Sequence, residues 1–173
     1  MRVTPPEFVV NPDPHSPVDW RRFLFLWVSA STVGWTVGFT VFGGTLAGLV
    51  VGIMQWLVLR QQVSRSGWWV LASTVGWIGG GFGGLIVGLS VIRDVGWNGA
   101  FTVASILVGA VTGVMQWIVL QWQVPGAGWW VLASTVGWTV GFTVSGTMGF
   151  TVGGVMFGLI TGLLLVGLLQ HPA

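Results

Sequence analysis

The 173-residue sequence contains no cysteine and no lysine, and each absence excludes a class of chemistry. A chain without cysteine forms no disulfide, offers no thiol nucleophile and supplies no thiolate to an iron–sulfur cluster. A chain without lysine forms no Schiff base with retinal or pyridoxal phosphate. Any function must therefore come from other side chains.

Charged residues are also scarce, at 6% of the chain against 53% hydrophobic residues, and the mean hydropathy is +0.86. Roughly a quarter of the residues of a soluble domain are charged, so this composition predicts an integral membrane protein. The sequence pI of about 11.3 reflects six arginines against four acids. These arginines stand where membrane topology places them, so the pI does not indicate a nucleic-acid partner.

The apolar segments predict helices rather than barrel strands, because small residues recur at every fourth position and both faces of most segments are apolar. A two-part motif occurs three times. Its first part, beginning and ending with tryptophan, stands at 27–35, 69–77 and 130–138. Its second part stands at 52–59 and 113–120, with a degenerate copy at 154–161. The repeat predicts an all-α membrane protein of six transmembrane helices, arranged as three tandem helical hairpins with pseudo-threefold symmetry.

These repeats divide the chain into a tail and three units. An irregular extramembrane tail over 1–19 precedes unit 1 at 20–66, unit 2 at 67–126 with an extended outer end, and unit 3 at 127–173 with a degenerate second helix. The predicted helices cover 22–42, 45–63, 68–92, 97–123, 128–145 and 148–169, and Asp19 is expected to cap the first of them. A re-entrant hairpin in place of two full spans stays open, because units 1 and 3 are short.

Arginines and tryptophans predict the orientation in the membrane. One arginine, Arg93, falls on the side opposite the N-terminus, whereas five fall on the N-terminal side: Arg2, Arg21, Arg22, Arg60 and Arg65. This excess predicts that both termini are cytoplasmic. Tryptophans near helix ends are expected at the lipid–water interface, namely Trp68, Trp69, Trp122, Trp129 and Trp130.

Glycines at fourfold spacing form ribbons along the predicted helices, and such ribbons let helices approach closely in lipid. The glycines selected as packing candidates are Gly34, Gly38, Gly76, Gly80, Gly84, Gly137 and Gly141. Packing within one chain explains part of the pattern. The number of ribbons exceeds what one small bundle needs, so we expect some of them to face another subunit.

Two glutamines, Gln55 and Gln116, occupy equivalent positions inside predicted spans. A buried amide needs a hydrogen-bond partner, and the expected partners are a neighbouring helix backbone or Ser73, Thr74, Ser134 or Thr135. A polar ring around a pore or ligand is the alternative. Phe157 holds the third equivalent position and would interrupt such a ring.

Three equivalent tryptophans, Trp35, Trp77 and Trp138, lie two turns farther inside the predicted spans. They are expected to fill space beside glycines, and stacking on a pigment is the alternative. No metal site, resident cofactor or catalytic group is predicted. His15 and His171 lie outside the predicted spans, and no acid lies inside one to serve a proton relay.

The motifs Gln-Trp-Leu-Val-Leu-Arg at 55–60 and Gly-Trp-Trp-Val-Leu-Ala-Ser at 67–73 resemble those of Gly/Trp-rich multipass membrane proteins of cyanobacteria and Chloroflexota-type bacteria. Through the repeats the resemblance covers residues ~20 to 169. It implies a bacterial inner or photosynthetic membrane and carries no activity or site residue with it.

These features predict a non-enzymatic membrane scaffold or accessory subunit. Membrane lipid and either a homo-oligomer or a larger membrane complex are its expected partners. One alternative is a channel or transporter for a small or uncharged solute, because three repeats around one axis can enclose a path. Another is a membrane protein that binds pigment or lipid.

Overall fold

The computed structural model describes residues 19–63 and 66–170. These residues form five α-helices: α1 (Trp20–Thr40), α2 (Ala47–Leu59), α3 (Trp68–Leu120), α4 (Trp129–Met148) and α5 (Phe150–Gln170). The predicted tail, apart from Asp19, lies outside the described residues, as does His171. Asp19 caps α1 as expected, because its carboxylate accepts hydrogen bonds from the backbone N–H groups of Arg21 and Arg22, each over 3.2 Å.

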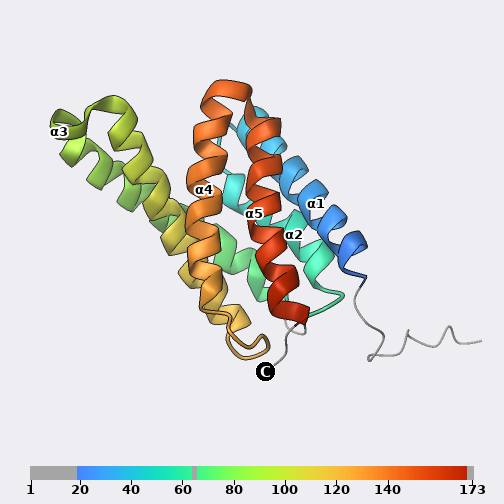
Figure 1. The fold of residues 1–173 in the computed structure, drawn as a ribbon. Helices are drawn as coiled ribbons and strands as arrows, with labels where there is room; N and C mark the ends of the chain where they lie inside the picture. Colours follow the sequence, from blue (N-terminus) through green and yellow to red (C-terminus); the bar gives the residue numbers. More distant parts are fainter. Residues whose placement is uncertain (1–18, 64–65, 171–173) are drawn as a thin grey trace, which may run out of the picture.

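The longest helix, α3, is interrupted at Gly96, where φ is 71° and ψ is 178°. Residues 68–95 form its first arm and residues 97–120 its second arm. The arms pack antiparallel, so that Gly76 faces Thr112 and Gly88 faces Ala100. Figure 1 shows the two arms extending away from the other helices and turning back at their tip. The predicted break near Arg93 and Asp94 thus falls two residues later, at a glycine.

The five helices close into a ring. Each helix packs against the one that follows it in the described chain, and α5 packs against α1. No other pair of helices among the described residues is in close backbone contact. The centre of the ring is therefore left to side chains, which all five helices contribute.

Helix ends define two ends of this ring. We call the end that carries Arg21, Arg22 and Arg60 the arginine end. α1 begins there, α2 ends there, α3 both begins and ends there, α4 begins there and α5 ends there. The opposite end carries the turns before α2 and α5, and the tip of the α3 arms lies on that side as well (Figure 1).

Three of the helices, α1, α3 and α5, are long and apolar enough to cross a membrane. At 1.5 Å per residue, the 21 residues of α1 extend about 31 Å and the first arm of α3 about 42 Å. α2 is apolar but has 13 residues, or about 20 Å. Its predicted range of 45–63 was too long at both ends.

The connection between α4 and α5 also differs from the prediction. The turn was expected near Ser145 and Gly146, whereas α4 continues through Met148 and the chain turns at Gly149, where φ is 91°. Gly146 lies within α4, where its φ is not positive. The single-residue turn leaves α4 and α5 antiparallel and in contact.

Candidate functional site

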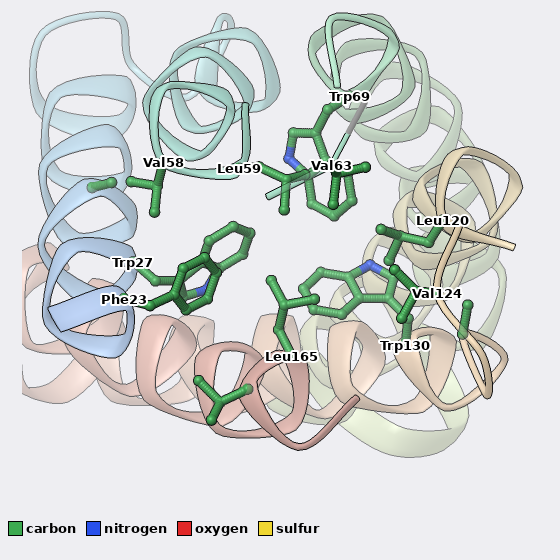
Figure 2. Packing of buried hydrophobic residues seen from close by; sticks show 13 residues of the cluster. Phe23, Trp27, Val58, Leu59, Val63, Trp69, Leu120, Val124, Trp130 and Leu165 are labelled. Atoms are coloured by element: carbon green, nitrogen blue, oxygen red, sulfur yellow. The ribbon is translucent and has the colours of Figure 1, made fainter. Parts of the chain in front are cut away.

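Three tryptophans meet in the centre of the ring near the arginine end. Trp27, Trp69 and Trp130 come from α1, α3 and α4 and are 0–1% exposed. Their ring centroids lie 6.0, 6.0 and 5.3 Å apart in edge-to-face arrangements, which aromatic pairs prefer. Figure 2 shows them approaching one another from three sides, with Leu165 of α5 beside them. We call this group the indole triad.

The predicted interfacial position of Trp69 and Trp130 is wrong. Each is the second residue of its helix, and successive residues of a helix point about 100° apart. The preceding residues, Trp68 and Trp129, therefore face outward and are each 63% exposed. Equivalence to Trp27 in the repeat was the signal in the sequence that could have identified the inward-facing tryptophan of each pair.

Two glutamines connect the indole triad to the surrounding helices. The Gln55 amide oxygen accepts a hydrogen bond from the Trp69 indole over 3.1 Å, and its amide nitrogen donates to Ser31 over 3.1 Å. Gln55 is fully buried and in this way joins α1, α2 and α3.

Gln116 repeats this arrangement one unit later. It accepts from the Trp130 indole over 2.9 Å and donates over 2.9 Å to Ser73, one of the four expected side-chain partners. Both glutamines are therefore satisfied inside the ring, and neither forms a polar ring around an open path.

The third unit holds the remaining tryptophan, Trp27 of unit 1, through Thr161, whose hydroxyl accepts from the Trp27 indole over 3.0 Å. That hydroxyl also donates to the Phe157 carbonyl over 2.8 Å.

The predicted third copy of the motif, at 154–161, is corrected by the structure. Gly158 meets Val28 and Ser31 as Gly52 meets Val70 and Ser73. The copy therefore begins one turn later, and Thr161, not Phe157, is equivalent to the glutamines. Sequence reasoning missed this role of Thr161, because the third copy was aligned on the Gly-Val-Met sequence at 154–156, which lies one turn too early in the helix.

A second aromatic group fills the ring toward the opposite end. The predicted tryptophans Trp35, Trp77 and Trp138 meet there, with centroids 4.7 Å apart for Trp35 and Trp138 and 5.1 Å apart for Trp77 and Trp138. Phe39, Phe142 and Phe157 pack against them. These rings contact each other rather than lining an empty centre.

Two buried polar atoms have no hydrogen-bond partner among the described residues. They are the Thr112 hydroxyl oxygen and the Trp138 indole nitrogen. The equivalent indole of Trp35 donates to the Ser145 hydroxyl over 3.2 Å. In unit 2 the residue equivalent to Ser145 is Gly84, which has no side chain that could accept a corresponding bond from the Trp138 indole.

The seven predicted ribbon glycines all contact a neighbouring helix segment of the same chain. A Cβ added at Gly76 would lie 2.5 Å from the Thr112 Cα, and one at Gly80 would lie 2.7 Å from the Val108 Cα. At Gly34, Gly38, Gly84, Gly137 and Gly141 the added atom would lie within 3.1 Å of Val51, Ala47, Ala104, Phe157 and Trp35, respectively. Within the described part of the chain, these seven positions thus serve contacts inside one molecule.

Among the described residues, no group of three or more His, Cys, Asp or Glu side chains is placed to hold a metal ion. Arg93 and Asp94 are both exposed at the tip of the α3 arms. The buried polar groups are hydroxyls, amides and indoles, most of which bond one another.

A groove of about 590 Å³ lies between the two arms of α3 near the arginine end. It was not predicted from the sequence. Two exposed indoles stand at its mouth, from Trp68 on the first arm and Trp122 just beyond the second. Its other lining residues are Leu71, Ala72, Val75, Met115, Ile118, Val119 and Gln123.

Comparisons of the chain with protein-family models, curated proteins and solved structures give no match. The interpretation of the aromatic core and the groove therefore depends on their geometry.

Proposed function

We propose that this chain is an integral protein of a bacterial inner or photosynthetic membrane and acts there as a non-enzymatic scaffold or accessory subunit. In this proposal α1, α2, the two arms of α3, α4 and α5 are six membrane spans arranged as three hairpins. The three units correspond to residues 20–66, 67–126 and 127–173. The arginine end faces the cytoplasm, following the positive-inside rule.

The observation that carries this proposal is the solid aromatic centre of a closed ring. The indole triad and the Trp35, Trp77 and Trp138 group occupy the interior along its axis. Most of the buried polar side chains in this centre bond one another, which supports a structural role for them. The same packing argues against a central path for a solute, because a path would have to displace several mutually bonded indoles.

The outer surface supports the membrane location. Large apolar side chains are exposed on every helix, among them Phe25, Ile53, Ile86, Leu132 and Leu163. A surface of this kind is stable in hydrocarbon and unstable in water. The short α2 is accommodated by local thinning of the bilayer or by the turn that precedes it.

Partner contacts are assigned to the α3 arms rather than to the glycine ribbons. The ribbons are already used within the chain, whereas the arms extend beyond the other helices (Figure 1). Phe82, Leu85, Ile86, Leu89 and Trp97 of these arms are each more than half exposed. An apolar projection of this kind suits contact with a second copy or with a larger membrane complex.

Cysteine cross-linking tests the proposal directly, because the chain has no cysteine of its own. Ile86→Cys places one thiol on the α3 arms, and Leu132→Cys places a matched thiol on α4. We expect Ile86→Cys in native membranes to give a covalent adduct of defined mass and Leu132→Cys to give none. A monomeric mass in mild detergent, together with no adduct from either variant, would contradict the scaffold function. Visible absorbance of the purified protein would instead favour pigment binding.

A further inference from the structure

We propose that the groove between the arms of α3 holds an acyl chain of an anionic phospholipid. This inference rests on the membrane location in the proposed function but not on the scaffold role. Three observations carry it, namely the lining of the groove, its size and the charge at its end of the molecule.

The lining of the groove matches an apolar chain with a polar end. Leu71, Val75, Met115 and Ile118 provide hydrocarbon walls, and one lining residue, Gln123, carries a polar side chain. Gln123 lies just beyond α3, at the arginine end, whereas Val75 and Met115 lie seven or eight residues farther along the arms. The groove therefore extends about 10 Å from the level of the headgroups toward the middle of the bilayer.

The groove is too small to enclose a membrane-spanning helix. A membrane-spanning helix about 30 Å long and about 10 Å across occupies on the order of 2,400 Å³. The groove offers about 590 Å³. A flexible hydrocarbon chain fits a space of this size, and the flat faces of Trp68 and Trp122 can pack against its methylene groups.

The repeat indicates that only unit 2 has an indole at both positions. Unit 1 has Leu26 where unit 2 has Trp68, and it has Gln61 where unit 2 has Trp122. Unit 3 retains a tryptophan at the first position, Trp129, and has Gly167 at the second. Trp122 is 83% exposed, so the aromatic core does not require it. A contact outside the chain explains why an indole stands on both walls of this groove.

The charge at the arginine end selects an anionic headgroup. Arg21, Arg22 and Arg60 are exposed there, and none forms an ion pair with another described residue. The guanidinium groups of Arg21 and Arg60 lie over the rings of Trp20 and Trp56, at 5.2 and 5.5 Å from the centroids. These arginines belong to α1 and the end of α2, and a phosphodiester headgroup above the groove would lie at the same level of the membrane as their positive charge.

Native mass spectrometry after reconstitution tests this assignment. The protein is placed in vesicles of equal phosphatidylglycerol and phosphatidylethanolamine and purified again in mild detergent. We expect one phosphatidylglycerol per chain to remain bound. Trp68→Leu combined with Trp122→Gln introduces the residues of unit 1 and should lower the bound fraction at least about tenfold. Trp129→Leu, which removes an equally exposed indole from outside the groove, should leave the bound fraction unchanged.

Filling the groove gives an independent second variant. Ile118→Trp adds volume to its wall and should also expel the lipid, while the Trp68 and Trp122 indoles stay in place. The assignment would be overturned by a wild-type chain without bound lipid, by equal retention in the variants, by equal uptake of both lipids, or by a pigment in the groove. Resistance to alkaline carbonate extraction shows separately whether the chain is integral to the membrane, so the two proposals fail independently.

Discussion

The hydroxyl of Thr161 accepts a hydrogen bond from the Trp27 indole over 3.0 Å and joins two helices 134 positions apart in the sequence. Both side chains are fully buried. At the other two junctions between repeat units, the polypeptide chain connects the helices directly, from α2 to α3 and from α3 to α4. Closure between α5 and α1 has no such connection and depends on side-chain contacts, of which this hydrogen bond is the most buried.

Thr161→Val should destabilise the protein. Valine keeps the approximate shape of threonine but cannot accept the hydrogen bond, so the Trp27 indole N–H would remain buried without a partner. The expected decrease in the free energy of unfolding is about 1–3 kcal/mol, measured by denaturant unfolding in mild detergent. Thr151→Val is the control, because its exposed hydroxyl makes a weaker contact of 3.3 Å with Thr36. Equal stability of the two variants would contradict the role of Thr161 in closing the ring.

The same substitution at Thr112 should have the opposite effect. Thr112 is 1% exposed, and its hydroxyl oxygen has no hydrogen-bond partner among the described residues. Thr112→Val removes a desolvated polar group and retains the packing against Gly76. We expect the free energy of unfolding to rise by about 1–3 kcal/mol in the same assay. A decrease would mean that the hydroxyl has a partner in the folded protein.

The sequence predicted the helical class, and its fourfold glycine spacing predicted close helix contacts, because both depend on local patterns. It also named Ser73 among several possible partners of the two glutamines, and Gln116 donates to Ser73. Ser31, the partner of Gln55, was not among those named. It did not separate Trp68 from Trp69, because both are tryptophan and only their direction on the helix differs. That direction is decided by which face meets the other units, and it becomes visible in the sequence when Trp69 is aligned with Trp27.

The groove and the exact positions of the turns could not be predicted from the sequence for a related reason. The arms of α3 are in close contact from Gly76 to Gly88 and separate toward Trp68 and Trp122, where each arm packs against a different neighbour. Such divergence depends on the whole ring rather than on the arms alone. The turn at Gly149 was likewise hidden, because Gly146 was an equally good candidate on composition.

Cysteine labelling should establish the orientation in the membrane. Asn98→Cys lies at the tip of the α3 arms, and Gln61→Cys lies at the arginine end; both positions are exposed. With the N-terminus inside, a membrane-impermeant maleimide should label Asn98→Cys in intact cells and label Gln61→Cys only after permeabilisation. The reverse pattern would contradict the orientation derived from the arginines. Labelling of both positions in intact cells would contradict an odd number of spans between them.

Gly76→Ala should weaken the contact between the α3 arms. The new Cβ would lie 2.5 Å from the Thr112 Cα, and a backbone atom cannot move without separating the arms. An expected decrease of about 1–3 kcal/mol in the free energy of unfolding follows from overpacking. At Gly81→Ala on the same arm, no atom beyond the helix's own backbone lies within 4 Å of the added Cβ, and the variant should gain up to about 1 kcal/mol from helix propensity. Similar effects at both positions would contradict close packing of the arms.

The break in α3 should require glycine at position 96. Its φ of 71° and ψ of 178° fall in a region that is essentially restricted to glycine, because a Cβ there clashes with the neighbouring backbone. Gly96→Ala should therefore lower the free energy of unfolding by about 1–3 kcal/mol, even though nothing beyond the adjacent backbone lies within 4 Å of the added atom.

Gly146→Ala provides the matched control for this position. It also has open space around the added Cβ, but its backbone lies within α4 with no positive φ. We expect Gly146→Ala to be neutral or stabilising by up to about 1 kcal/mol. Because the space is open at both sites, a difference between them isolates the backbone angles. If both variants unfold at the same denaturant concentration, the strained backbone at residue 96 is contradicted.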